Sequence, residues 1–213
     1  MTRLVRLGEV ATITQGMSVT GGDRDPRRPC EGARHGDWQV QAVGVGDVQD
    51  DRLVLEWLRT VDLARNVKTE KHVLRPEDVL VSARSTVVKA ALVPSSIARA
   101  IADATLLVVR AEEPDLGNYL WWFLTSTFGR RRVLGQMKGS TTLLFLSAAS
   151  LAEIELPLPE AAELYRIADL VEVSERAYAT ATEAAQRRRA VFREVVIDRL
   201  RHTANDEEVS AWR

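Results

Sequence analysis

Hydrophobic and polar residues follow two different spacings along this chain of 213 residues. In residues 38–49, 72–93 and 100–113, apolar and β-branched residues come in short runs separated by turn residues, which is typical of β-strands. In residues 117–137, Tyr119, Trp122 and Ser126 instead recur at helical spacing, which predicts a helix. This first part of the chain is therefore expected to form an α+β domain, mostly β with a few helices.

The C-terminal part carries the longest regular pattern in the sequence. Residues 161–200 contain neither Pro nor Gly, and an a-type heptad row runs from Leu164 to Phe192. The matching d-type row is imperfect, because Ser174 and Arg188 interrupt it. Forty helical residues would form a rod about 60 Å long, which favours one long coiled-coil helix with a partner over a helix folded back on its own domain. The residues expected to face the partner are Leu164, Ile167, Val171, Tyr178, Ala181, Ala185, Phe192 and Val195.

Pro157 and Pro159 mark the expected end of the globular part, since each proline fixes its own φ and restricts the residue before it. The expected organisation is a domain over residues 1–158, a long helix over 159–202 and a frayed polar tail over 203–213.

Composition narrows the class of protein. No apolar run approaches the roughly 20 residues that cross a bilayer, and the N-terminus lacks the apolar core of a secretory signal. Cys30 is the single cysteine, so a reducing, cytoplasmic location is expected.

Residues 1–150 hold 20 basic against 17 acidic residues, a net charge of +3, whereas residues 151–213 hold 9 against 13, a net charge of −4. Only four basic residues are lysine, and arginine suits bidentate contacts to phosphate and guanine, although codon bias explains this excess equally well.

Motifs for catalysis are missing from the sequence. It contains no phosphate-binding loop, no Gly-x-Ser-x-Gly, no Asn-Pro-Pro-aromatic segment and no Glu-x-Lys. The three histidines, His35, His72 and His202, are too scattered to suggest a metal site. We therefore expect a binding protein without a cofactor or metal of its own. The alternative is an enzyme whose site lies in the polar loop over 21–37, which offers only Asp23, Asp25 and His35.

Five segments, in their order along the chain, resemble the specificity subunit of type I restriction-modification systems. They are "VRLGEVATITQG", "LRPEDVLVSARST", "IADATLLVVR" followed by "NYLWWFLTS", "GSTTLLFLSAASLAEIELPLP", and the helix "RIADLVEVSERAYATATEAAQRRRAVFREVVIDRL". Two positions depart from the family pattern. Glu163-Leu164 stands where Glu-Gln is common, and Arg84-Ser85-Thr86 stands where Arg-Gly-Ser is common.

The resemblance implies a half-length subunit, since family members have two target recognition domains and two long helices. Two copies would then pair through antiparallel helices, and their symmetry would predict an interrupted palindromic DNA site. The family implies a methyltransferase subunit that brings S-adenosylmethionine, and a translocating nuclease subunit for restriction. The chain itself would be a non-catalytic, sequence-specific binder of double-stranded DNA that serves phage defence.

Lys, Arg and small hydroxyl side chains on loops are the expected contacts to DNA, because they bind phosphate and base edges. Four clusters provide them, in "RNVKTEKH", "SARSTVVK", "GRRR" and "KGSTT". The predicted DNA-binding residues are Lys68, Lys71, Arg84, Ser85, Thr86, Lys89, Arg130, Arg131, Arg132, Lys138, Ser140 and Thr141.

A protein-protein adaptor is the main alternative. The same fold would serve another defence complex, with the helix docking a different enzyme and with little DNA sequence preference. An affinity for DNA that depends neither on salt concentration nor on DNA sequence would favour the adaptor over the specificity subunit.

Overall fold

The computed structural model describes residues 2–19, 37–56, 58–64, 70–113, 115–140 and 143–203. The chain divides into two compact units, residues 1–168 and 169–213. Cys30 and most of the loop predicted over 21–37 lie outside the described residues. Among the described residues, no helix is long and apolar enough to cross a membrane.

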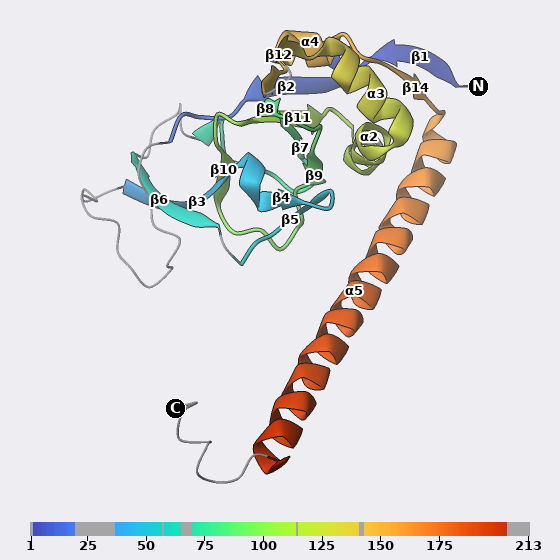
Figure 1. Ribbon diagram of the computed structural model, residues 1–213. Helices are drawn as coiled ribbons and strands as arrows, with labels where there is room; N and C mark the ends of the chain where they lie inside the picture. Colours follow the sequence, from blue (N-terminus) through green and yellow to red (C-terminus); the bar gives the residue numbers. More distant parts are fainter. Residues whose placement is uncertain are drawn as a thin grey trace. The chain divides into compact units, whose positions relative to one another are not determined.

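A four-stranded antiparallel sheet with the strand order β2-β11-β7-β9 forms the centre of the first unit. Its strands are rich in Val, Leu and Ala, and β7 is buried at every position, as expected for strands covered on both faces. Figure 1 shows the sheet between the helices α2–α4 and a second sheet that contains β3 and β6. The four strands are β2 (Ala11–Gln15), β7 (Val79–Ser82), β9 (Ala90–Leu92) and β11 (Leu106–Ala111).

The second sheet has the strand order β10-β3-β6, with β10 parallel and β6 antiparallel to β3. Val40, Val61 and Ile101 form its buried cluster. A short hairpin of β4 and β5 follows the 3-10 helix η2. These elements are β3 (Asp37–Val43), η2 (Val45–Asp47), β4 (Val48–Gln49), β5 (Arg52–Leu53), β6 (Arg59–Ala64) and β10 (Ala100–Ala102).

An ion pair fixes the turn "RPED" that the sequence pattern predicts before β7. The Asp78 side chain is 2% exposed and accepts hydrogen bonds from the Arg75 backbone N–H at 2.8 Å and from Arg110 Nη2 at 2.6 Å. The hydrogen bond to Asp78 raises the pKa of the Arg110 guanidinium above its usual value. A buried carboxylate with this many donors stabilises the start of β7 against the adjacent strand β11.

The segment predicted as one helix over 117–137 is two helices, because Ser126 breaks it. Ser126 has an extended backbone, with φ −62° and ψ 156°, and its Oγ accepts a hydrogen bond from the Gly129 N–H at 3.0 Å. A serine that caps the next helix in this way ends the preceding one. The two helices are α2 (Leu116–Thr125) and α3 (Thr127–Gln136).

A two-stranded ribbon joins the N-terminal strand to the segment that leads into the long helix. β1 pairs antiparallel with β14, and Leu4 lies opposite Pro157. Tyr119 on α2 is 2% exposed and donates a hydrogen bond from its hydroxyl to the Pro157 carbonyl. The remaining elements of this region are β1 (Arg3–Arg6), the 3-10 helix η1 (Leu7–Glu9), α4 (Ala148–Ala152) and β14 (Glu155–Leu158).

The long helix predicted over 159–202 is α5 (Ala161–Thr203), with 43 residues. Its first two turns belong to the first unit, where Leu164 and Ala168 are buried. The predicted fold class, a β-rich α+β part followed by one long helix, is confirmed.

We predict that Gly129→Ala destabilises the first unit by about 2 kcal/mol, because a Cβ at this position would overlap the Phe123 carbonyl. Gly135→Ala on the same helix is the matched control. A Cβ there would meet nothing within 4 Å, so the change should be neutral or raise the free energy of unfolding by up to about 1 kcal/mol. Urea unfolding followed by tryptophan fluorescence measures both. Equal effects of the two substitutions would contradict the close packing of α3 against α2.

We further predict that Tyr119→Phe lowers the free energy of unfolding by about 1–2 kcal/mol at pH 7, because the Pro157 carbonyl loses its donor. Burial raises the pKa of Tyr119. This group therefore contributes stability below the ordinary tyrosine pKa of about 10, and that stability is lost as the pH rises through the raised pKa.

The variant should for this reason show a weaker alkaline loss of stability than the wild type. Tyr165→Phe is the control, since Tyr165 is 65% exposed. Urea unfolding at pH 7 and at about pH 10.5 distinguishes the two substitutions. If the free energy of unfolding changes with pH identically in the wild type and in Tyr119→Phe, the burial of the Tyr119 hydroxyl is contradicted.

Candidate nucleic-acid interface

A three-stranded sheet brings together two of the predicted DNA-binding clusters, although they are more than 50 residues apart in the sequence. The central strand β13 pairs antiparallel with β12 on one side and with β8 on the other. Phe145 on β13 therefore lies opposite Lys138 on β12 and opposite Arg84 on β8. The three strands are β8 (Arg84–Ser85), β12 (Lys138–Ser140) and β13 (Leu143–Phe145).

The three side chains opposite one another form a row on one face of the sheet, because directly paired residues of neighbouring strands point to the same side. We call this set the Arg84–Phe145–Lys138 row. Arg84 and Lys138 are exposed, and Phe145 is 43% exposed, which is unusual for an aromatic ring at the centre of a sheet. The Arg84 Cζ lies 5.4 Å from the centre of the Phe145 ring, in a cation-π contact that orients the guanidinium.

The loop after β8 adds a hydroxyl beside the row. The Ser82 hydroxyl accepts a hydrogen bond from the Lys89 N–H at 3.0 Å, and the Ser85 hydroxyl accepts one from the Val87 N–H at 3.3 Å. These bonds fix the loop from within, so that Thr86 at its tip is exposed. Thr86 can donate a hydrogen bond outward, and Ser85 is partly exposed beside it.

Gly139 lies beside the row on the edge strand β12, with φ 143°. This positive φ favours glycine and leaves the backbone there without a side chain. Ser140 continues the strand, but its side chain, together with Thr141 and Lys68, lies outside the described residues. Lys71 is exposed in the short segment before β7.

The three arginines of "GRRR" on α3 have three different environments. Arg130 donates to the Asp51 carboxylate at 2.6 Å and to the Thr125 carbonyl at 2.7 Å. Arg132 lies 4.9 Å above the Phe128 ring and 3.5 Å from a carboxylate oxygen of Glu155. Arg131 is exposed, and its side chain has no hydrogen bond or ion pair among the described residues. Arg130 and Arg132 are thus paired with acids that lie far from them in the sequence.

Lys89 also has internal partners. Its Nζ donates to the carbonyls of Val45 and Val48, at 3.3 and 2.9 Å. Together with Arg130, it holds the segment from η2 to the β4–β5 turn against the domain. The charged groups of Lys89 and Arg130 therefore stabilise the fold. The side chains better placed to contact a ligand are those of Arg84, Thr86, Arg131 and Lys138.

Phe145 is the residue that sequence reasoning missed. It follows two leucines in the apolar run "TTLLFLS", so it reads as a core residue. Only the strand alternation distinguishes it, since the next residue, Leu146, is 4% exposed. Among the described residues, no group of three or more His, Cys, Asp or Glu side chains could hold a metal ion.

The helix residues predicted to face a partner fall into two groups. Leu164 and Val171 are buried, and Ile167 is partly buried. The other predicted residues on α5 are exposed, and three of them are large apolar side chains. The exposed members are Tyr178 at 52%, Phe192 at 68% and Val195 at 57%, with the smaller Ala181 and Ala185.

The sequence matches no family model and no curated protein. Solved structures, however, are similar to the chain over most of its length. A chain of a type I restriction-modification system, solved to explain complex assembly and conformational transition, has 20% sequence identity and a TM-score of 0.59, covering 91% of this chain and 43% of that one. The HsdS subunit of Thermoanaerobacter tengcongensis has 21% identity and a TM-score of 0.51, covering 86% of this chain and 39% of its own.

The S subunit of a type I restriction-modification system from M. genitalium has 12% identity and a TM-score of 0.55, covering 85% of this chain and 41% of its own. This chain thus spans about two fifths of the length of each of these three chains. The resemblance predicted from five sequence segments is confirmed at the level of the fold: the chain has the fold of part of a type I restriction-modification specificity subunit.

Proposed function

We propose that this chain recognises a specific double-stranded DNA sequence as the specificity subunit of a type I-like restriction-modification or methyltransferase complex. The observation that carries the proposal is the Arg84–Phe145–Lys138 row, an exposed surface of two cations around an aromatic ring. The structural likeness to specificity subunits supports the same assignment. Such a subunit is non-catalytic and acts from the cytoplasm.

The chemistry of the row suits both parts of DNA recognition. Arg84 and Lys138 can each neutralise a phosphate, and Thr86 and the backbone at Gly139 can donate hydrogen bonds to phosphate oxygens. Phe145 offers an apolar surface, which can contact the methyl group of thymine in the major groove. Arg131 on α3 is a further cation for the DNA backbone.

The chemistry of modification would belong to a partner. A methyltransferase subunit would bring S-adenosylmethionine, and a translocating nuclease subunit would join it for restriction and phage defence. This chain would supply the recognition of the target and the helix on which the partners assemble.

Pairing of two copies would bring two such domains and two long helices together. The exposed apolar face of α5 supports a homodimer through antiparallel helices. One heptad register pairs Ile167 with Phe192 of the other copy. It also brings Tyr178 opposite Ala181, so that a large side chain faces a small one. A two-fold axis in this dimer implies an interrupted palindromic site.

We predict that Arg84→Ala and Lys138→Ala each weaken DNA binding about tenfold and reduce the salt slope by about one unit, because each removes a phosphate contact. Phe145→Ala should lower the preference for the target over random duplexes more than it lowers the salt slope. The target is first found by selection from randomised duplexes. Fluorescence anisotropy between about 50 and 200 mM salt then measures affinity.

Arg187→Ala is the control, since Arg187 is an exposed arginine on α5, paired with Glu183. It should leave affinity and slope unchanged. If the row variants also leave both unchanged, the DNA contacts lie elsewhere. If selection yields no preferred sequence and the affinity of the wild type for DNA does not depend on salt concentration, the chain is better described as a protein-protein adaptor.

We also predict that the chain, with a mass of 23.7 kDa, forms a dimer that Phe192→Asp dissociates. Burying an aspartate in place of an aromatic ring on the heptad face should raise the dimer Kd more than about 100-fold. Ile197→Asp is the matched control, because Ile197 is 50% exposed but lies on the outer face of the following turn. Sedimentation equilibrium measures both. A dimer that tolerates Phe192→Asp, or is lost equally with Ile197→Asp, would contradict this pairing face.

A further inference from the structure

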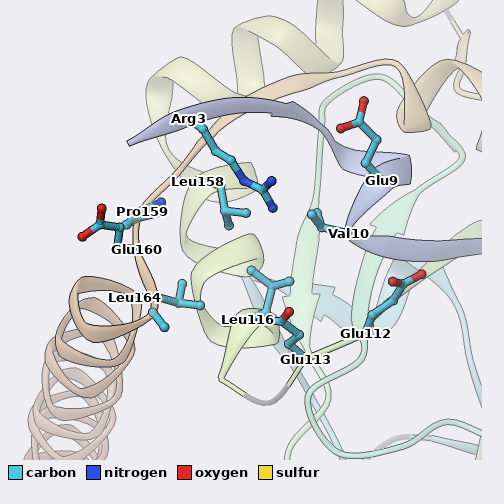
Figure 2. A pocket seen from close by; sticks show the side chains of 11 residues that line it. Arg3, Glu9, Val10, Glu112, Glu113, Leu116, Leu158, Pro159, Glu160 and Leu164 are labelled. Carbon is cyan, nitrogen blue, oxygen red and sulfur yellow. The ribbon is translucent and has the colours of Figure 1, made fainter. Parts of the chain in front are cut away.

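The first unit has a pocket of about 300 Å³ lined by residues of β1, β14 and the first turn of α5. Figure 2 shows that Glu112, Glu113 and Glu160 are among the residues around it. These glutamates come just before α2 and α5, where the positive end of the helix dipole favours a carboxylate. The fold therefore accounts for the acidic lining, and a ligand is not needed to explain it.

The tip of the β7–β9 hairpin, residues 83–88, presents an apolar side chain to solvent. Val87 is 54% exposed, whereas the next residue, Val88, is 5% exposed. Glycine and polar residues are the usual ones at such tips, and an apolar β-branched residue is not. The same tip carries Arg84 and Thr86, so Val87 lies among groups that suit a phosphate backbone.

The backbone of Val87 already has its hydrogen-bond partners. Its N–H donates to the Ser85 hydroxyl at 3.3 Å, and its carbonyl accepts from the Ser82 hydroxyl at 3.4 Å. Both partners belong to the hairpin itself, and Ser82 is 0% exposed. The part of Val87 that is left to contact a ligand is therefore its isopropyl group.

Contacts on both sides of Val87 restrain the tip. The Ser82 hydroxyl also accepts from the Lys89 N–H at 3.0 Å, and Arg130 Nη1 donates to the Val88 carbonyl at 3.3 Å. The buried side chain of Val88 adds an apolar anchor. A side chain on a restrained loop loses less conformational entropy when it binds, which favours a specific contact.

The dimensions of the tip suit the major groove of DNA. A two-stranded β-ribbon fits into this groove, which is about 12 Å wide, and β7 and β9 form an antiparallel ribbon of this kind. Val87 comes three residues after Arg84, so their Cα atoms are at most about 11 Å apart. Arg84 can therefore contact a phosphate at the edge of the groove while Val87 reaches the base edges within it.

We propose that Val87 is a specificity-determining residue that enters the major groove and contacts the C5-methyl group of a thymine. Among the unmodified bases, this methyl is the apolar group that the major groove presents. The inference rests on the proposed function and deepens it. Phe145 lies opposite Arg84, three residues before Val87, so the two apolar side chains contact different base pairs.

Replacing thymine by uracil tests the proposal, because uracil lacks the methyl group and keeps the same hydrogen-bonding edge. Each thymine of the selected target is replaced in turn, and fluorescence anisotropy measures the Kd of the full chain for each duplex. At one thymine, the replacement should raise the Kd about fourfold for the wild type and less than about 1.5-fold for Val87→Ala. Phe145→Ala should keep the full cost at this position.

Val173→Ala is the matched control, because Val173 is a valine on α5 that is 56% exposed. It should show the same cost of uracil as the wild type at every position. Circular dichroism verifies that each variant is folded.

5-Methylcytosine carries the same methyl group, so duplexes with this base at each cytosine form a second arm of the experiment. A gain in affinity there that Val87→Ala abolishes, without any cost of uracil, would overturn the assignment to thymine.

Two further outcomes separate this inference from the proposed function. If the chain binds a specific target but no thymine in it shows this coupling to Val87, or the target contains no A·T pair, the inference alone is overturned. If the chain binds DNA without any sequence preference, the proposed function fails and the inference fails with it.

Discussion

The register of β13 between β8 and β12 decides which side chains this protein presents to a ligand. Leu146 is buried, and its N–H donates to the Ala83 carbonyl at 2.9 Å, so the strand continues in register beyond Phe145. Because side chains alternate along a strand, burial of Leu146 directs Phe145 outward. A slip of one residue would bury the ring and separate Arg84 from Lys138. The candidate interface is thus a consequence of core packing one residue away.

The basic residues of the first unit divide according to what lies near them in space. Asp50 and Asp51 form the β4–β5 turn with φ values of 46° and 60°, a conformation that costs energy for residues other than glycine. Trp121 donates to the Asp51 carbonyl and Arg130 to its carboxylate, and these contacts stabilise the turn. Arg130 therefore has a structural role. Arg131 follows it directly in the sequence but points away on the helix, and it stays available.

How far the sequence predicts this structure depends on the range of each interaction. The long helix and its heptad rows are local, so spacing alone locates them. The split at Ser126 is also local, and a serine three residues before Gly129 in a helical segment could have indicated it. The partners of Lys89 and Arg130 are 41 and 79 residues away in the sequence, and no local pattern encodes them. The same holds for Phe145, whose exposure depends on strands contributed by two distant segments.

The distribution of charge along α5 bears on how two copies would pair. Residues 160–175 hold five acids against one arginine, whereas residues 186–201 carry a net charge of +4. Acids near a helix N-terminus and arginines near its C-terminus are favoured by the helix dipole, but that effect falls off within the first and last turns. Here the asymmetry extends over about four turns at each end, beyond the reach of the dipole. Parallel pairing would bring like charges together along both ends, and antiparallel pairing brings each acidic end beside a basic one. In the proposed dimer, the charge pattern would therefore favour the antiparallel orientation, which the apolar seam, interrupted at Ser174 and Arg188, specifies only weakly.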